Sequence, residues 1–341
     1  MQENVLPYGI QAYVVALVSA LILTPIIRWI CVRYSLQADP NPIIATHKTA
    51  TPTLGGVGIY IAFFIALSVV MIPSGETSFL LKLFLGTLPI FLMGIYDDLR
   101  GLSFKFKGVA EIFLVIIFIV VFQLKPEFNI HPVFEYLLMV LWFVGIINAF
   151  NLIDIMDGLA SGIGLFASFG FFLLAAISGP DKAYLLPIAG ALAGCYLAFL
   201  HYNFNPAKIF LGDNGSLVMG LALAYLGFEL VGHEPLSFKV MAPVIILAIP
   251  IFEVFLLVIR RMKKKISVFE GSPDHTALVI QALGYSIPQT AWIIYLLSVI
   301  LVAIGLWVWK SSDIIQVTVS LALLILAGFL LRHMRDIKVQ R

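Results

Sequence analysis

Apolar runs of about 17 to 25 residues recur along the whole chain, separated by short segments that contain proline, glycine or charged residues. A helix of that length crosses the hydrocarbon core of a bilayer, because each residue adds about 1.5 Å of rise. The pattern predicts about eleven transmembrane helices, at residues 8-30, 54-72, 79-96, 109-124, 132-150, 159-178, 184-202, 215-231, 239-259, 288-309 and 314-331. The predicted fold is an all-α, polytopic integral membrane protein in which residues 1-341 form a single domain.

Composition supports a membrane protein and excludes several other classes. Only 12% of the residues are charged and 61% are hydrophobic, with a mean hydropathy of +1.03, whereas soluble domains carry about 25% charged residues. The net charge of +2 gives no indication of a nucleic-acid partner. Cys31 and Cys195 are the two cysteines, and their spacing indicates neither a disulfide framework nor a zinc site.

Positive charge is distributed unevenly over the segments that connect the predicted helices. Alternating these segments assigns sixteen of the Lys and Arg residues to one side of the membrane and five to the other. Because cytoplasmic loops carry the excess of Lys and Arg, the amino terminus is predicted to lie outside and the carboxyl terminus in the cytoplasm. The first run has no basic segment before it, so we expect a retained helix rather than a cleaved signal peptide.

The concentrated polar residues fall in the segments on the cytoplasmic side, at about 31-53, 97-108, 151-158, 203-214 and 260-287. Polar side chains are costly in lipid, so their alignment in one plane predicts an active site at this face. A secondary transporter is the alternative from another class of protein. It would place its binding residues near the bilayer midplane, commonly between two related repeats, and the chain contains no convincing internal repeat.

One acidic motif lies at the end of the third run, where Asp97 and Asp98 are adjacent and Lys107 follows. Neighbouring carboxylates repel each other unless a cation or a shared proton relieves them. A divalent metal with a phosphate is the usual solution beside a lysine, although a pair of acids alone would also suit a solvated helix end.

A second polar motif follows the fifth run, where Asn148, Asn151, Asp154 and Asp157 recur every third residue. This spacing keeps them neighbours on a helix, where they could ligate a metal or bind a nucleotide. Helix capping accounts for one or two such residues and not for four. A third motif places Asp213 between two glycines, which let the backbone approach an anion or a metal closely.

Basic and acidic residues complete the candidate set. His47 and Lys48 could bind phosphate or anchor their loop to anionic lipid, and anchoring is the role expected for most of the basic run at 260-265, including Lys263 and Lys264. Beyond that run, Asp274 and His275 lie in a turn-rich loop that could fold over the site. Two acids predicted inside the helices, Glu111 and Glu253, are either functional or engaged in contacts between helices.

Taken together, HKTATPTLGG, GIYDDLRG with Lys107, NAFNLIDIMDGLASG, FLGDNGS and SPDHT, in this order and spacing, resemble the polyprenyl-phosphate N-acetylhexosamine-1-phosphate transferases over positions 47 to 284. The SPD start of the last motif resembles the GlcNAc-1-phosphate transferases, of WecA and TagO type, more than the phospho-MurNAc-pentapeptide translocases. The resemblance implies transfer of a sugar 1-phosphate from a UDP-sugar to a lipid phosphate, with Mg²⁺ or substituting Mn²⁺, at the cytoplasmic face of a bacterial inner membrane.

The resemblance also implies roles for individual residues. Asp213 and Asn151 match metal ligands, and the catalytic set is Asp97, Asp98, Asp154 and Asp157. The residues that match substrate-binding positions are His47, Lys48, Lys107, Asn148, Asp274 and His275. Relatives commonly carry His-x-His-His in the last loop, whereas Thr276, Ala277 and Leu278 follow His275 here, so donor binding is predicted to use His275 with Asp274 or nearby basic residues.

The expected substrates are UDP-GlcNAc and undecaprenyl phosphate, because short cytoplasmic loops leave little protein to recognise a peptide on a muramyl group. The phospho-MurNAc-pentapeptide translocase is the alternative within the family, and a homodimer is left open. A CDP-alcohol phosphotransferase fits poorly, since its motif requires an Arg that is missing after Asp157 and Gly158.

Overall fold

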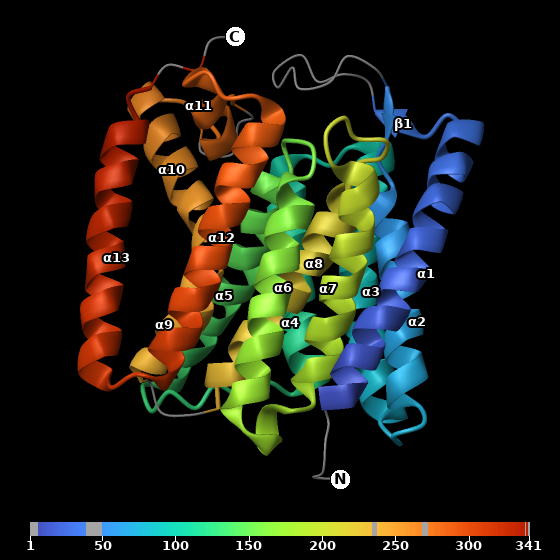
Figure 1. Ribbon diagram of the computed structural model, residues 1–341, viewed down its shortest axis with the longest axis horizontal. Coiled ribbons are helices and arrows are strands. Elements are labelled where there is room, and N and C mark those ends of the chain that lie inside the picture. Colours follow the sequence, from blue (N-terminus) through green and yellow to red (C-terminus); the bar gives the residue numbers. More distant parts are fainter. Residues whose placement is uncertain (1–5, 39–49, 234–236, 268–271, 338, 340–341) are drawn as a thin grey trace.

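A computed structural model of the protein describes residues 6–38, 50–233, 237–267, 272–337 and 339. Its helices run side by side and form a bundle (Figure 1). They are α1 (Leu6–Arg33), α2 (Gly55–Met71), α3 (Thr77–Arg100), α4 (Phe104–Phe122), α5 (Pro132–Ile153), α6 (Leu159–Ser178), α7 (Leu185–Asn203), α8 (Asp213–Val231), α9 (Met241–Ile246), α10 (Ala248–Lys264), α11 (Thr276–Ala282), α12 (Ile287–Lys310) and α13 (Asp313–Met334). Two short strands, β1 (Gln37–Ala38) and β2 (Thr51–Pro52), pair antiparallel, and 3₁₀ turns lie at Pro180–Lys182 and Phe238–Val240.

Eight helices in the described part of the chain are long and apolar enough to cross a membrane: α1, α3, α5, α6, α7, α8, α12 and α13. A ninth span results if α9 and α10 count as one. Of the two other predicted runs, α2 is apolar but has only 17 residues, and α4 carries Lys105, Lys107 and Glu111 near its start. The predictions of an all-α fold and of a multi-pass membrane protein are confirmed, while eleven crossings stay a prediction.

The ninth predicted run, 239-259, is not a continuous helix, and that prediction is wrong. It forms α9 and α10, which meet at Leu247 with a bend of 80°. Pro250 explains the break, since a proline has no N–H to donate to the carbonyl of Ile246 and its ring would clash with that carbonyl. The bend redirects α10, whose basic end lies beside the final loop of the site.

Helix α8 forms the centre of the bundle and is the most deeply buried of the spanning helices. It packs against α2, α3, α5 and α6, whereas α13 is the most exposed spanning helix and presents apolar side chains such as Ile325 and Phe329 outward. The buried position of α8 matters for function, because its first residue is Asp213.

One end of the bundle collects the carboxyl ends of α3, α5 and α7 and the amino ends of α4, α6 and α8, together with α11 (Figure 1). Backbone hydrogen bonds hold the connection before α8 against the segment before α2. The N–H of Gly55 donates to Phe210 O at 3.0 Å, and the N–H of Gly56 donates to Leu211 O at 2.9 Å. A Cβ on Gly56 would lie 2.2 Å from Gly215 N, so this contact requires glycine.

Candidate active site

A lysine and two acids from three helices form the centre of the polar end. Lys107, in the first turn of α4, has its Nζ 3.0 Å from Asp97 Oδ2 and also contacts the carboxylate of Asp213. Asp97 is in the last turn of α3 and accepts the N–H of Leu102 at 2.6 Å, which fixes its carboxylate beside the short turn into α4. These three side chains are partly exposed, so a ligand at this end of the bundle can reach them.

Asn151 joins this centre from the last turn of α5. Its Nδ2 donates to Asp213 Oδ1 at 2.7 Å and to Ser216 Oγ at 3.1 Å, and its Oδ1 accepts from Lys107 Nζ at 3.3 Å. The structure thus brings together four residues that the sequence analysis selected from separate motifs: Asp97, Lys107, Asn151 and Asp213. We refer to these four residues as the acid–lysine cluster.

Asp98 has a different environment from its neighbour Asp97. Its Oδ1 accepts the backbone N–H of Asp213 at 3.0 Å, and its Oδ2 accepts that of Asn214 at 2.9 Å. These are two of the N–H groups at the start of α8 that have no partner within the helix, so Asp98 caps α8 from another helix. Gly212 permits the sharp entry into α8, with a φ of 72° and with Thr53 O 2.1 Å from the position of a Cβ.

The two acids after α5 also differ from each other. Burial raises the pKa of Asp154 to about 8, and repulsion from Asp213 and Asp98 acts in the same direction. Asp157 is buried, and its Oδ2 accepts from Asn205 Nδ2 at 2.8 Å and from the N–H of Ala207 at 2.9 Å. The sequence analysis predicts both acids as catalytic, whereas these contacts give Asp157 a part in folding the connection between α7 and α8.

Asn148, His47 and Lys48 are the other predicted substrate-binding residues of the earlier motifs. Asn148 lies one turn before Asn151 on α5, and its amide donates to the buried carboxylate of Glu111 and to Val144 O at 3.0 Å. The interpretation of Glu111 as a contact between helices therefore holds. His47 and Lys48 lie outside the described residues.

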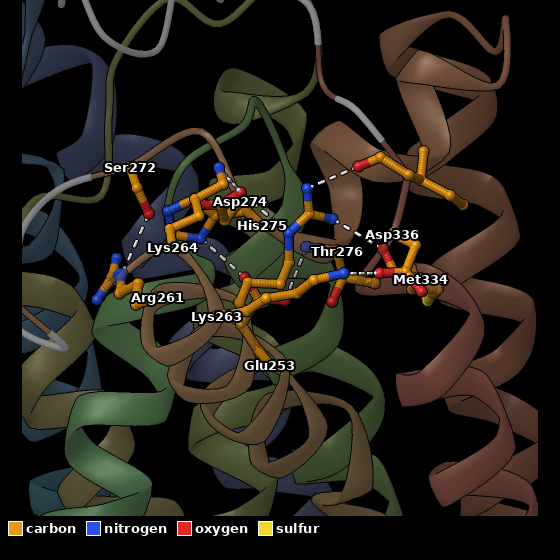
Figure 2. A network of polar contacts seen from close by, with 12 residues as sticks. Glu253, Arg261, Lys263, Lys264, Ser272, Asp274, His275, Thr276, Met334 and Asp336 are labelled. Carbon is orange, nitrogen blue, oxygen red and sulfur yellow. Dashed lines mark hydrogen bonds and ion pairs between the residues drawn. The ribbon is translucent and has the colours of Figure 1, made fainter. Parts of the chain in front are cut away.

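The last loop turns its polar side chains into the protein (Figure 2). Asp274 is fully buried, with its Oδ1 2.9 Å from Arg260 Nε and in contact with Lys264 Nζ. Burial alone would raise the pKa of Asp274, but Lys264 and Arg260 outweigh it and hold this pKa below its usual value. His275 is also buried, and its Nδ1 lies 2.8 Å from Glu253 Oε1.

These contacts show how the last loop is held. Asp274 and His275 both contact residues of α10, and their predicted role in substrate binding stays a prediction. Lys263 and Lys264 are predicted to face lipid, whereas Lys263 pairs with Asp336 and Lys264 with Asp274. Such pairs are not accessible from the sequence, because they depend on how α10 packs against the last loop and the carboxyl end of α13.

The acid–lysine cluster has the donor chemistry that Mg²⁺ requires, since carboxylate and amide oxygens are hard ligands. In the described part of the chain, no group of three or more His, Cys, Asp or Glu side chains is arranged to hold a metal. Mg²⁺ commonly binds through one or two carboxylates together with water and substrate phosphates. The carboxylates of Asp213 and Asp97 and the amide oxygen of Asn151 are ligands of the right type for it, and in this structure all three contact Lys107 Nζ.

Two residues that contact candidate site residues were not selected as site residues by the sequence analysis. Ser216, one turn into α8, orients Asn151, and its place in FLGDNGS three residues after Asp213 was a usable signal. Arg260 is buried beside Asp274 rather than directed to lipid, and an acid following a basic run by about ten residues was the available signal.

Comparison with known proteins places the chain in a family. The model of glycosyl transferase family 4 matches residues 80–231. A probable undecaprenyl-phosphate N-acetylglucosaminyl 1-phosphate transferase of Bacillus subtilis is 33% identical over 317 residues, covering 89% of this chain and 86% of that protein. An undecaprenyl-phosphate alpha-N-acetylglucosaminyl 1-phosphate transferase of Thermotoga maritima is 31% identical over 234 residues, 68% of each chain.

A phospho-N-acetylmuramoyl-pentapeptide-transferase of Staphylococcus epidermidis is 30% identical over 330 residues, covering 88% of this chain and 98% of that protein. The chain belongs to glycosyl transferase family 4 and is a multi-pass membrane phosphoglycosyl transferase. The resemblance read from the motifs is therefore confirmed at the level of the family. These comparisons give no support to the homodimer that the sequence leaves open.

Proposed function

We propose that this protein transfers N-acetylglucosamine 1-phosphate from UDP-GlcNAc to undecaprenyl phosphate and releases UMP. The relatives from Bacillus subtilis and Thermotoga maritima support the choice of sugar and lipid. In this reaction an oxygen of the lipid phosphate forms a bond to the β-phosphorus of the donor. The bond from that phosphorus to the oxygen bridging the two donor phosphates breaks, and UMP leaves.

The observation that carries the proposal is the position of Lys107 between Asp97 and Asp213 at the end of the bundle where the motifs meet. Attack of one phosphate on another gathers several negative charges, which fixed cations stabilise in the transition state. The lipid phosphate is mostly ionised near neutral pH, with a second pKa of about 6, so the reaction does not demand a strong base. Lys107 binds phosphate oxygens, and Asp97 sets the direction of its ammonium group.

Asp213 and Asn151 would hold Mg²⁺, with Asp97 as a further oxygen donor. The bound ion would supply neutralisation of the phosphate charges and of the charge that develops on UMP. Asp98 fixes the backbone that carries Asp213, through the two N–H bonds at the start of α8.

The site would face the cytoplasm in a bacterial inner membrane. The excess of Lys and Arg in the segments at this end supports that orientation, with the amino terminus outside and eleven crossings. A reporter fused after Arg341 is then cytoplasmic, and one inserted near Gly75 is external. Both reporters on one side of the membrane would contradict the proposed topology.

A phospho-MurNAc-pentapeptide transferase is the second candidate, favoured by the similarity that spans 98% of the Staphylococcus epidermidis protein. The deciding experiment compares kcat/KM for UDP-GlcNAc, UDP-GalNAc and UDP-MurNAc-pentapeptide with purified protein and one lipid acceptor. We expect UDP-GlcNAc to be preferred, since a site built to bind one sugar leaves polar groups unpaired with another. A preference for the pentapeptide donor would replace the proposal with the second candidate.

A further inference from the structure

Arg260 connects three segments that are distant in the sequence. It lies near the end of α10 and is buried, with Nε donating to Asp274 Oδ1 at 2.9 Å. Its two terminal nitrogens donate to backbone carbonyls, Nη1 to the O of Met334, the last residue of α13, at 2.9 Å and Nη2 to the O of Ile337, three residues beyond it, at 2.8 Å. One guanidinium thus joins α10, the loop before α11 and the carboxyl end of α13.

The bonds to α13 are of a kind that stabilises a helix end. The last carbonyls of a helix have no partners within it, and the helix dipole places negative charge there. A guanidinium satisfies both needs, because its planar fork presents several N–H donors in fixed directions. Lysine also has three N–H donors, but all three are on one nitrogen and cannot match the spaced, planar directions of Nε, Nη1 and Nη2.

The bond to Asp274 fixes the loop that carries His275. Asp274 has no exposed surface, and its carboxylate pairs with the positive charges of Arg260 and Lys264. The adjacent residues are held by α10 as well, since Glu253 accepts from His275 Nδ1 and from the N–H of Thr276 at 3.0 Å. The loop and the end of α13 therefore share one buried cation as their common contact.

We propose that Arg260 is a positioning residue that couples the carboxyl end of α13 to the loop carrying His275, so that the most exposed helix of the bundle helps to set the geometry of this loop. The hydrogen-bond partners of Arg260 are Asp274, Met334 and Ile337, and none of them belongs to the acid–lysine cluster. Its effect on the reaction, which rests on the proposed function, passes through residues 272–276.

Hydrogen exchange of the full-length protein in detergent tests the coupling without any assay of activity. In Arg260→Gln, amide exchange is expected to accelerate by about tenfold or more in two segments together, 272–283 and 330–337, because both lose a fixed contact and open locally. The reporting amides include Thr276 N–H and Arg335 N–H, which are hydrogen-bonded in the structure. Peptides from α7 and α8 are expected to exchange as in the wild type.

Arg335→Gln is the matched control, because it removes an exposed guanidinium from the same end of α13, one that pairs with the exposed Asp336. We expect its exchange pattern to equal that of the wild type. Acceleration in only one of the two segments in Arg260→Gln, or in neither, would overturn the coupling.

If Arg260→Gln loses protection from hydrogen exchange throughout the chain, Arg260→Lys is the second variant to test. The lysine keeps a charge for Asp274 but loses the fork, so we expect exchange to accelerate in both segments, more in 330–337 than in 272–283. Equal protection of both segments in Arg260→Lys and in the wild type would contradict the role of the fork.

The KM values of the two substrates distinguish a positioning role of Arg260 from a purely structural one. In Arg260→Gln, the KM for the UDP-sugar is expected to rise by about tenfold, while the KM for the lipid phosphate and the Mg²⁺ requirement stay unchanged. An equal rise in both KM values would contradict positioning through the His275 loop. If the wild type itself transfers no sugar phosphate, the proposed function fails and the exchange experiment still decides the coupling.

Discussion

The carboxylate of Asp98 accepts the backbone N–H of Asp213 at 3.0 Å and that of Asn214 at 2.9 Å, and these bonds join the end of α3 to the start of the central helix α8. Asp97, one residue earlier, instead contacts Lys107 at 3.0 Å. The two adjacent carboxylates thus point in different directions. Asp98 contacts the backbone at the start of α8, and Asp97 contacts Lys107 in the candidate site. Their substitutions should consequently have different effects.

We expect Asp98→Asn to lower the free energy of unfolding by about 1.5–3 kcal/mol, since an amide can accept at only one position and the N–H groups of α8 lose a charged partner. Asp97→Asn should leave stability close to the wild type and reduce kcat by about 100-fold or more, because Lys107 loses a partner that orients it. Thermal unfolding and turnover in the same detergent measure both. Identical losses in the two variants would contradict the division of roles.

Asp213→Ala is predicted to abolish turnover while the protein still folds. Asp98 holds the backbone of residue 213 and not its side chain, so the start of α8 keeps its cap in this variant. Turnover of the wild type should also require Mg²⁺ or Mn²⁺ and stop on addition of a chelator. Activity near that of the wild type in folded Asp213→Ala would show that the metal assignment is wrong.

Asn151 and Ser216 form a matched pair for testing the amide at the site. Asn151→Ala removes contacts to both Asp213 and Lys107, so we expect a loss in kcat of about 100-fold. Ser216→Ala removes only the hydroxyl that accepts from Asn151, and a loss of less than about tenfold is expected. A larger effect of Ser216→Ala than of Asn151→Ala would contradict the geometry of the cluster.

The pKa of Asp274 predicts how stability depends on pH. Arg260 and Lys264 hold this pKa below its usual value, so the folded state binds the proton more weakly than the unfolded state. The stabilisation is complete above the unfolded value of about 3.9 and is lost as the pH falls through the lower folded value. The melting temperature should therefore fall below about pH 4.

Asp274→Asn should have a lower melting temperature than the wild type at pH 7 and a smaller decrease below pH 4, because the titrating group is gone. Asp336→Asn is the control. The pKa of Asp336 is also lowered, by Lys263 and Arg335, but this side chain is exposed and solvent screens its pairs. A steep acid dependence that persists in Asp274→Asn would assign the effect to other groups.

Much of the fold could be predicted from the sequence, because each predicted apolar run corresponds to a helix or, at 239-259, to a bent pair. The four residues of the acid–lysine cluster could also be predicted, since Asp97, Lys107, Asn151 and Asp213 lie at helix ends where their type and spacing are unusual. The spacing of residues along the chain cannot show which carboxylate contacts a segment that is distant in the sequence. For that reason the roles of Asp98, Asp157 and Asp274 emerge only from tertiary contacts.

The fate of the β-phosphate tests the central claim most directly. Purified protein with Mg²⁺, undecaprenyl phosphate and UDP-GlcNAc labelled with ³²P at the β-position should transfer the label to the lipid fraction and release unlabelled UMP in equal amount. Label recovered as UDP, with unlabelled sugar on the lipid, would mean that the sugar moves without its phosphate and would contradict the account.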